Sequence, residues 1–204
     1  VGDEITTLPS NEKAKVKQIL VVDKDSKTAK VGQPATITLD KEVDVSRGCV
    51  LTKDSEIGVY KKLRASLLWM DDNTLTEGTD YLVKLGTKTI PAIVTKIEYA
   101  VDVNTGEHIQ KEELNKNEIA LCDILLTEPI VVDKFDNHKT LGELILIDRV
   151  TNMTSACGVV EDTLEKADYG SHKASFKNGE VEARGDIFEE FYYDSASLNV
   201  LKYQ

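Results

Sequence analysis

The chain has 204 residues, of which 41% are hydrophobic and 30% are charged, and this balance supports one large domain or two small ones with real cores. A formal net charge of −11 argues against broad binding to nucleic acid or to an anionic membrane, because phosphate contacts need clustered Lys and Arg. No stretch approaches the ~18 apolar residues of a membrane-spanning helix. Because the chain starts with Val rather than Met, we expect a fragment or a processed product.

Apolar and polar residues alternate at period 2 through most of the chain, and this alternation predicts strands. The predicted strands cover residues 15–22, 35–39, 65–70, 81–85, 92–99, 119–126 and 143–147. Short segments rich in Gly, Asp, Asn or Pro separate them, which is typical of a β-barrel or a β-sandwich. Helical periodicity is scarce, and the segment 111–117 (KEELNKN) fits either a short helix or a polar loop.

The segment 141–160 (LGELILIDRVTNMTSACGVV) predicts a closing hairpin. Residues 144–147 are apolar on both faces of a strand, and residues 148–152 form a polar reversal. The returning residues, 153–160, include Ser, Ala, Cys and Gly, which allow a strand to approach its neighbour closely.

The three cysteines give little support to a disulfide framework. Cys49, Cys122 and Cys157 are widely spaced, and each has apolar or small neighbours, as is typical of reduced, buried thiols in a cytoplasmic protein. A nucleophilic thiolate would need a stabilising cation, and none is near in sequence, although the fold could supply a distant one. A structural role is favoured.

Other candidate catalytic groups also have simpler interpretations. His108, His138 and His172 lie beside turn or charged residues without metal-ligand spacing, so surface histidines are favoured over zinc ligands. The acidic pairs 71–72 and 189–190 are interpreted as solvated side chains rather than an acid–base pair, since catalysis needs environments that separate their pKa values. For Trp69, core packing is favoured over ligand stacking.

The segments GTKTIPAIVTKIEYAVDVNTGE (86–107) and NEIALCDILLTEPIVVDKFDNHKTLGELILIDRVTNMTSACGVV (117–160) resemble the third domain of the GTP-binding subunit of bacterial sulfate adenylyltransferases, or ATP sulfurylases. That family is related to elongation factor Tu. Residues 1–52, with VGDEI, VGQPATITL and DVSRGCVLT, are similar to the second domain of the same GTPase superfamily. The pattern at 148–152 is specific to the sulfate-activating branch, whereas VGDEI and SRG occur in many translational GTPases.

The resemblance implies an all-β fold with two consecutive translation-factor-type β-barrels. The first would comprise residues 1–54, incomplete or rearranged at its N-terminus; residues 55–64 would be a linker, and 65–161 the second barrel. Residues 162–204 would form a small β-rich extension, with a hairpin at Asn178–Gly179 because Asn-Gly favours a type I′ turn. The extension's aromatic centre would comprise Phe188, Phe191, Tyr192 and Tyr193.

The resemblance also implies a function for the parent protein. It would be a GTP-hydrolysing regulatory subunit, using GTP and Mg²⁺, that drives adenylyl transfer from ATP to sulfate on a separate catalytic subunit. The pattern G-x-x-x-x-G-K-[ST] is absent from the sequence, so we expect this chain to hold no cofactor, metal or catalytic residue and to be inactive alone. Its expected partners are a GTPase domain and the catalytic subunit, and neither nucleic acid nor membrane.

The polar turn supplies the candidate interface residues, which are Arg149, Thr151 and Asn152. Arg149 has a fork-shaped guanidinium suited to a partner's carboxylate. The alternative is a local salt bridge from Arg149 to Asp148 or Glu143, with Asn152 capping the turn. Two other functions remain open: barrels that hold an aminoacylated RNA end in a translation-type GTPase, and a freestanding β-rich protein-binding module. A continuous Lys/Arg groove would favour the RNA function.

Overall fold

The structure is a computed structural model that describes residues 1–167, 175–177 and 180–182. The chain divides into two units, residues 1–167 and 168–204. The elements are β1 (Glu4–Leu8), β2 (Glu12–Val21), β3 (Lys24–Ser26), β4 (Ala35–Leu39), β5 (Val50–Thr52), β6 (Gly58–Trp69), β7 (Leu75–Thr76), β8 (Asp80–Leu85), β9 (Lys88–Val101), β10 (His108–Ile109), β11 (Glu113–Leu114), β12 (Ile119–Val132), α1 (Lys139–Gly142), β13 (Glu143–Ile147), β14 (Thr154–Lys166), β15 (Ser175–Lys177) and β16 (Glu180–Glu182). The expected all-β class is confirmed.

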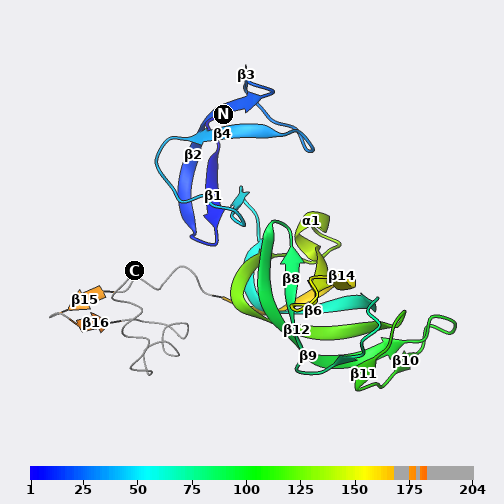
Figure 1. The fold of residues 1–204 in the computed structure, drawn as a ribbon. Coiled ribbons are helices and arrows are strands. Elements are labelled where there is room, and N and C mark those ends of the chain that lie inside the picture. The colour runs from blue at the N-terminus through cyan, green and yellow to red at the C-terminus, as the bar shows by residue number, and fades with distance from the viewer. Residues whose placement is uncertain (168–174, 178–179, 183–204) are drawn as a thin grey trace. The chain divides into compact units, whose positions relative to one another are not determined.

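Six long strands close into an antiparallel barrel (Figure 1). Neighbouring strands pair in the order β9-β12-β6-β14-β13-β8, and β8 pairs back with β9 to complete the ring. Closure leaves none of these six strands as a free edge, which removes a common site of aggregation. The short strand β10 pairs antiparallel with the end of β9, while β7 and β11 form a separate pair.

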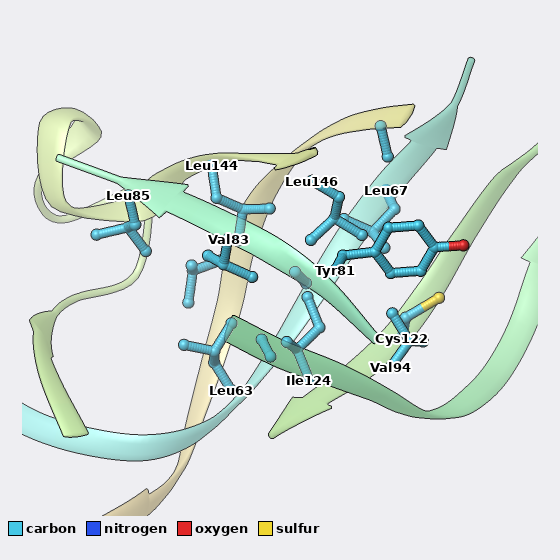
Figure 2. Packing of buried hydrophobic residues seen from close by; sticks show 14 of the residues in the cluster. Leu63, Leu67, Tyr81, Val83, Leu85, Val94, Cys122, Ile124, Leu144 and Leu146 are labelled. Carbon is cyan, nitrogen blue, oxygen red and sulfur yellow. The ribbon is translucent and has the colours of Figure 1, made fainter. Parts of the chain in front are cut away.

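The barrel interior is filled by the apolar side chains that the alternation predicts (Figure 2). In β6, for example, alternate residues are completely buried: Leu63, Ala65, Leu67 and Trp69. The residues that alternate with them, Arg64, Ser66 and Leu68, are partly exposed. Trp69 packs edge-to-face against Tyr81, with ring centroids 5.5 Å apart, and its Nε1 donates a hydrogen bond to the carbonyl oxygen of Asn73 at 2.8 Å. The predicted core role of Trp69 is therefore confirmed.

The closing hairpin is confirmed, with β13 paired to β14 and β14 paired in turn to β6. Small residues in β14 permit this close approach, as the sequence suggests. A Cβ added at Gly158 would lie 2.5 Å from the carbonyl oxygen of Ser66, a distance that a side chain cannot occupy unless the strands separate. Gly158 is thus required by the contact between β14 and β6.

Residues 1–54 form a second, smaller sheet around β2. The strand β2 pairs with β1, β3 and β4, and β5 pairs with β1. Its buried apolar cluster contains three residues, Ile5, Val16 and Ile19. This sheet therefore has far less buried apolar area to stabilise it than the barrel has.

Two segments and one cysteine differ from their predicted structure. Residues 58–64, expected in a linker, form the first half of β6, where Gly58 and Val59 are buried. Residues 111–117 contain only the two-residue strand β11 within a loop, so the helical alternative is wrong. Cys49, expected to be a buried thiol, is half-buried, whereas Cys122 is buried as expected. Cys157, which the sequence allows to be packed or partly exposed, is half-buried.

The predicted hairpin in the C-terminal unit is seen in part. Strands β15 and β16 pair antiparallel, with Lys177 opposite Glu180. The turn residues Asn178 and Gly179 lie outside the described residues, as do the predicted aromatic centre, the acidic pair 189–190 and His172.

Candidate interaction site at the turn between β13 and β14

The candidate interface residues lie on the turn 148–153, which joins β13 to β14. Two backbone hydrogen bonds close the turn: the amide of Asp148 donates to the carbonyl of Met153 at 2.9 Å, and the amide of Asn152 donates to the carbonyl of Asp148 at 2.9 Å. Asn152 has a φ of 58°, in the left-handed region that Asn tolerates better than most residues. The backbone therefore reverses tightly here.

The carboxylate of Asp148 holds the turn in one shape. Its Oδ1 accepts hydrogen bonds from the amide of Val150 at 2.9 Å, the amide of Thr151 at 2.6 Å and the hydroxyl of Thr151 at 2.9 Å. These donors, the Thr151 amide first, lower the pKa of Asp148 because they stabilise its charged form. Thr151 and Asn152 thus shape the turn itself.

Arg149 has a different partner from those considered in the sequence. Its Nη1 forms an ion pair with Oδ2 of Asp80, the first residue of β8, instead of with Asp148 or Glu143. Both side chains are about half exposed, at 47% and 55%, so the pair contributes little stability. The contact ties the turn to the neighbouring strand.

Carboxylates surround this end of the barrel. Asp71 accepts a hydrogen bond from the hydroxyl of Ser155 at 2.7 Å and one from the amide of Asn73 at 2.9 Å, and these bonds lower the pKa of Asp71. Burial raises the pKa of Tyr81 to about 12, with further contributions from the charges of Asp71, Asp148 and Asp80. Arg149 is the one cation that pairs with any of these three carboxylates within the described residues.

Two apolar side chains project from the turn, and neither was singled out from the sequence. Val150 is 88% exposed and Met153 is 67% exposed. In the sequence they look like ordinary members of an apolar hairpin. The signal that could have identified them is their place in or directly after the segment from Asp148 to Asn152, two residue types that favour turns.

The remaining polar candidates have structural partners. His108 stacks on Tyr99 with ring centroids 3.7 Å apart, and His138 Nδ1 lies 2.6 Å from a carboxylate oxygen of Asp133. Burial raises the pKa of the Cys122 thiol to about 12, which disfavours a nucleophilic thiolate. Asp72 is exposed and pairs with Lys116 at 2.6 Å.

Side chains that commonly bind metal ions are not clustered in the described ranges. These ranges contain no group of three His, Cys, Asp or Glu side chains placed to hold a metal ion. In the same ranges, no helix is long and apolar enough to cross a membrane. A groove of about 630 Å³ lies along β6, β13 and β14, but its lining is mostly apolar, including Leu68, Ile145 and Cys157.

The closed barrel with its small companion sheet defines the class: an all-β chain of the translation-factor GTPase type. Residues 62–161 match the family described as GTP-eEF1A C-terminal domain-like. A crystal structure of sup35 complexed with GDP superposes with a TM-score of 0.72 over 80% of this chain and 41% of that one; at 18% identity, this likeness shows the fold alone.

Curated relatives narrow the class further. The chain is 37% identical over 203 residues to a sulfate adenylyltransferase subunit 1 from Saccharophagus degradans, and 38% identical over 200 residues to one from Teredinibacter turnerae. These alignments cover 98% and 97% of this chain but 43% and 42% of the relatives, so the chain spans less than half of their length. The chain belongs to the sulfate adenylyltransferase subunit 1 family, within the elongation factor Tu-like GTPases.

Proposed function

We propose that this chain is the non-catalytic β-barrel portion of the GTPase subunit of a sulfate adenylyltransferase. The observation that carries the proposal is the similarity to subunits of that name along 97–98% of the chain. In the proposed reaction, a sulfate oxygen attacks the α-phosphorus of ATP, forming adenosine 5′-phosphosulfate, and pyrophosphate leaves. The partner subunit carries that step.

The proposed role of the barrel is mechanical. A closed barrel with an interdigitated core moves as a rigid body, because packed interiors are not continuously deformable. Such a body gives a GTPase domain a firm surface against which to repack when the γ-phosphate is lost, and it transmits the change to a subunit interface. The phosphate-binding pattern G-x-x-x-x-G-K-[ST] is absent from the sequence, so we assign GTP and Mg²⁺ to the GTPase domain of the parent protein.

We propose the turn 148–153 as part of the interface with the catalytic subunit. Arg149, Thr151 and Asn152 lie together on it, next to Asp80 and Asp148. Hydrogen bonds order the turn, and the turn is open to solvent. A partner can therefore bind with little loss of conformational entropy in the turn.

Reconstitution tests the proposal. The full-length subunit is mixed with its cognate catalytic subunit, and pyrophosphate release from ATP and sulfate is measured with and without GTP. We expect release to depend on GTP and to require both subunits. GTP-independent release at the same rate, or failure of the two subunits to associate, would refute the proposed function.

The charge distribution argues against RNA as the ligand of the barrel. Most basic groups of the described barrel have a carboxylate oxygen within 4.0 Å; they are Lys62, Arg64, Lys88, Lys96, Lys111, Lys116, Lys134 and Arg149. Paired cations are less available to phosphates than the clustered, free ones that nucleic-acid binding requires. Protein contacts are the better match to this surface.

A further inference from the structure

We infer that the turn 148–153 is a preformed docking element, in which Val150 and Met153 insert into an apolar socket rimmed by Lys and Arg on the catalytic subunit. The inference rests on the proposed function and adds the residues that make the contact. It assigns Asp148, Arg149 and Thr151 to positioning the turn.

The exposure of the two apolar side chains is the first step. Val150 and Met153 are 88% and 67% exposed, and Thr154 at the start of β14 is also exposed, whereas Ser155 and Ala156 after it are completely buried. Scattered apolar residues are ordinary on a protein surface. Here, however, two project from one six-residue turn whose backbone is fixed, and an adaptable Met beside a stiff, branched Val suits insertion into a pocket.

The rigidity of the turn is the second step. Three hydrogen bonds to Asp148 Oδ1 and two across the backbone leave little freedom between residues 148 and 153. A further bond, from the amide of Met153 to the hydroxyl of Thr151 at 3.3 Å, fixes the base of the Met153 side chain. An element ordered in advance loses less conformational entropy on binding.

The charges around the turn indicate which side chains should surround the apolar socket on the catalytic subunit. Asp71, Asp80 and Asp148 lie close enough to act together on Tyr81, and Arg149 offsets one of the three charges by pairing with Asp80. The turn therefore presents an apolar tip above a net negative base. Complementary interfaces place opposite potentials against each other, so the matching surface is apolar at its centre and basic at its edge.

Binding of the full-length subunit to its catalytic subunit tests the inference, by titration calorimetry at low and at moderate salt. The variants are Val150→Asp with Met153→Asp, and as a matched control Val103→Asp, because Val103 is also exposed, at 68%, and lies on another turn. We expect the double variant to raise Kd about tenfold or more and the control to leave it unchanged. Higher salt should weaken the wild-type complex.

The positioning role of Asp148 is tested by the affinity of two Asp148 variants for the catalytic subunit. Asp148→Ala removes the acceptor that fixes the turn and should raise Kd, whereas Asp148→Asn keeps one acceptor oxygen and should restore most of the affinity. Equal affinity for the wild type and the Val150/Met153 variant would overturn the inference and leave the proposed function standing. No association of the wild-type subunits would overturn both.

Discussion

At the scale of single residues, the environment of each cysteine decides its reactivity. Cys122 is completely buried in the barrel interior, and its thiol has a pKa of about 12 against an ordinary value of 9.0. Since the thiolate is the reactive form, each unit of pKa lowers its population about tenfold at neutral pH. Cys49 and Cys157 are half-buried.

Alkylation with iodoacetamide at pH near 8, followed by mass spectrometry, should therefore separate the three thiols. We expect Cys122 to react on the order of a thousandfold more slowly in the folded chain than in denaturant, because burial raises the pKa of its thiol from 9.0 to about 12. In denaturant, the three rates should converge. Equal rates in the folded chain would contradict the burial of Cys122.

The ion pair of Arg64 with Asp123 joins β6 to β12 on the outside of the barrel. Arg64 donates from Nε to Oδ1 at 2.7 Å and from Nη2 to Oδ2 at 3.1 Å, and Nη2 also donates to Glu98 at 2.6 Å. Burial alone would raise the pKa of Asp123, but the hydrogen bonds and charge of Arg64, helped by Lys62, lower it below its ordinary value.

Replacing Arg64 with Ala should lower the free energy of unfolding by about 2–3 kcal/mol, which urea unfolding at pH 7 would measure. The loss is smaller than for a buried carboxylate left without any cation, because Lys62 remains near Asp123. Because the folded pKa of Asp123 is depressed, its contribution is present above the unfolded value near 3.9 and is lost as pH falls through the folded pKa. The wild-type advantage over Arg64→Ala should thus shrink below pH about 4. An advantage that grows in acid would refute the assignment.

At the scale of elements, the contact of β14 with β6 depends on the absence of a side chain at Gly158. A methyl group there would meet the carbonyl of Ser66 at 2.5 Å, and backbone cannot rotate away as a flexible side chain can. Gly158→Ala should cost about 1–3 kcal/mol of unfolding free energy. The control is Cys157→Ala at the neighbouring, half-buried position, which should reduce the unfolding free energy by less. Equal stability of Gly158→Ala and the wild type would contradict this account of the contact between β14 and β6.

The sequence predicts an element well when residues close in the chain determine its structure, and poorly when pairing with distant strands determines it. Alternation located β4 and β13 with their observed bounds. In β13 the buried Leu144 and Leu146 alternate with more exposed residues, so the strand carries that pattern locally. The start of β6 at Gly58 was missed because GVYKK does not alternate, and its order comes from pairing with β12 and β14. Tertiary pairing overrides local pattern there.

The candidate site shows the same division. The reversal at 148–152 is local chemistry of Asp and Asn, so the sequence predicts it. The partner of Arg149 is not local: Asp80 is 69 positions away, and only closure of the barrel between β8 and β13 brings the two together. The exposure of Val150 and Met153 likewise follows from the way the hairpin ends, which no periodicity in the sequence records.

At the scale of the whole molecule, the two sheets of residues 1–167 differ in how well they are stabilised. The barrel cluster contains 24 buried residues, and the cluster of the first sheet contains three. Hydrogen exchange should therefore be slowest in β6, β12 and β14 and markedly faster in β1, β2 and β4, because local opening costs less where little apolar area is buried. The reverse order of protection, measured by mass spectrometry on the intact chain, would contradict this assignment.

The central proposal is that the barrel and the smaller sheet support chemistry that takes place elsewhere. Pyrophosphate release from ATP and sulfate, in the presence of GTP and Mg²⁺, tests it most directly when the purified 204-residue chain is compared with the full-length subunit bound to its catalytic partner. We predict release above background only from the complex. Release by the 204-residue chain alone would contradict the account.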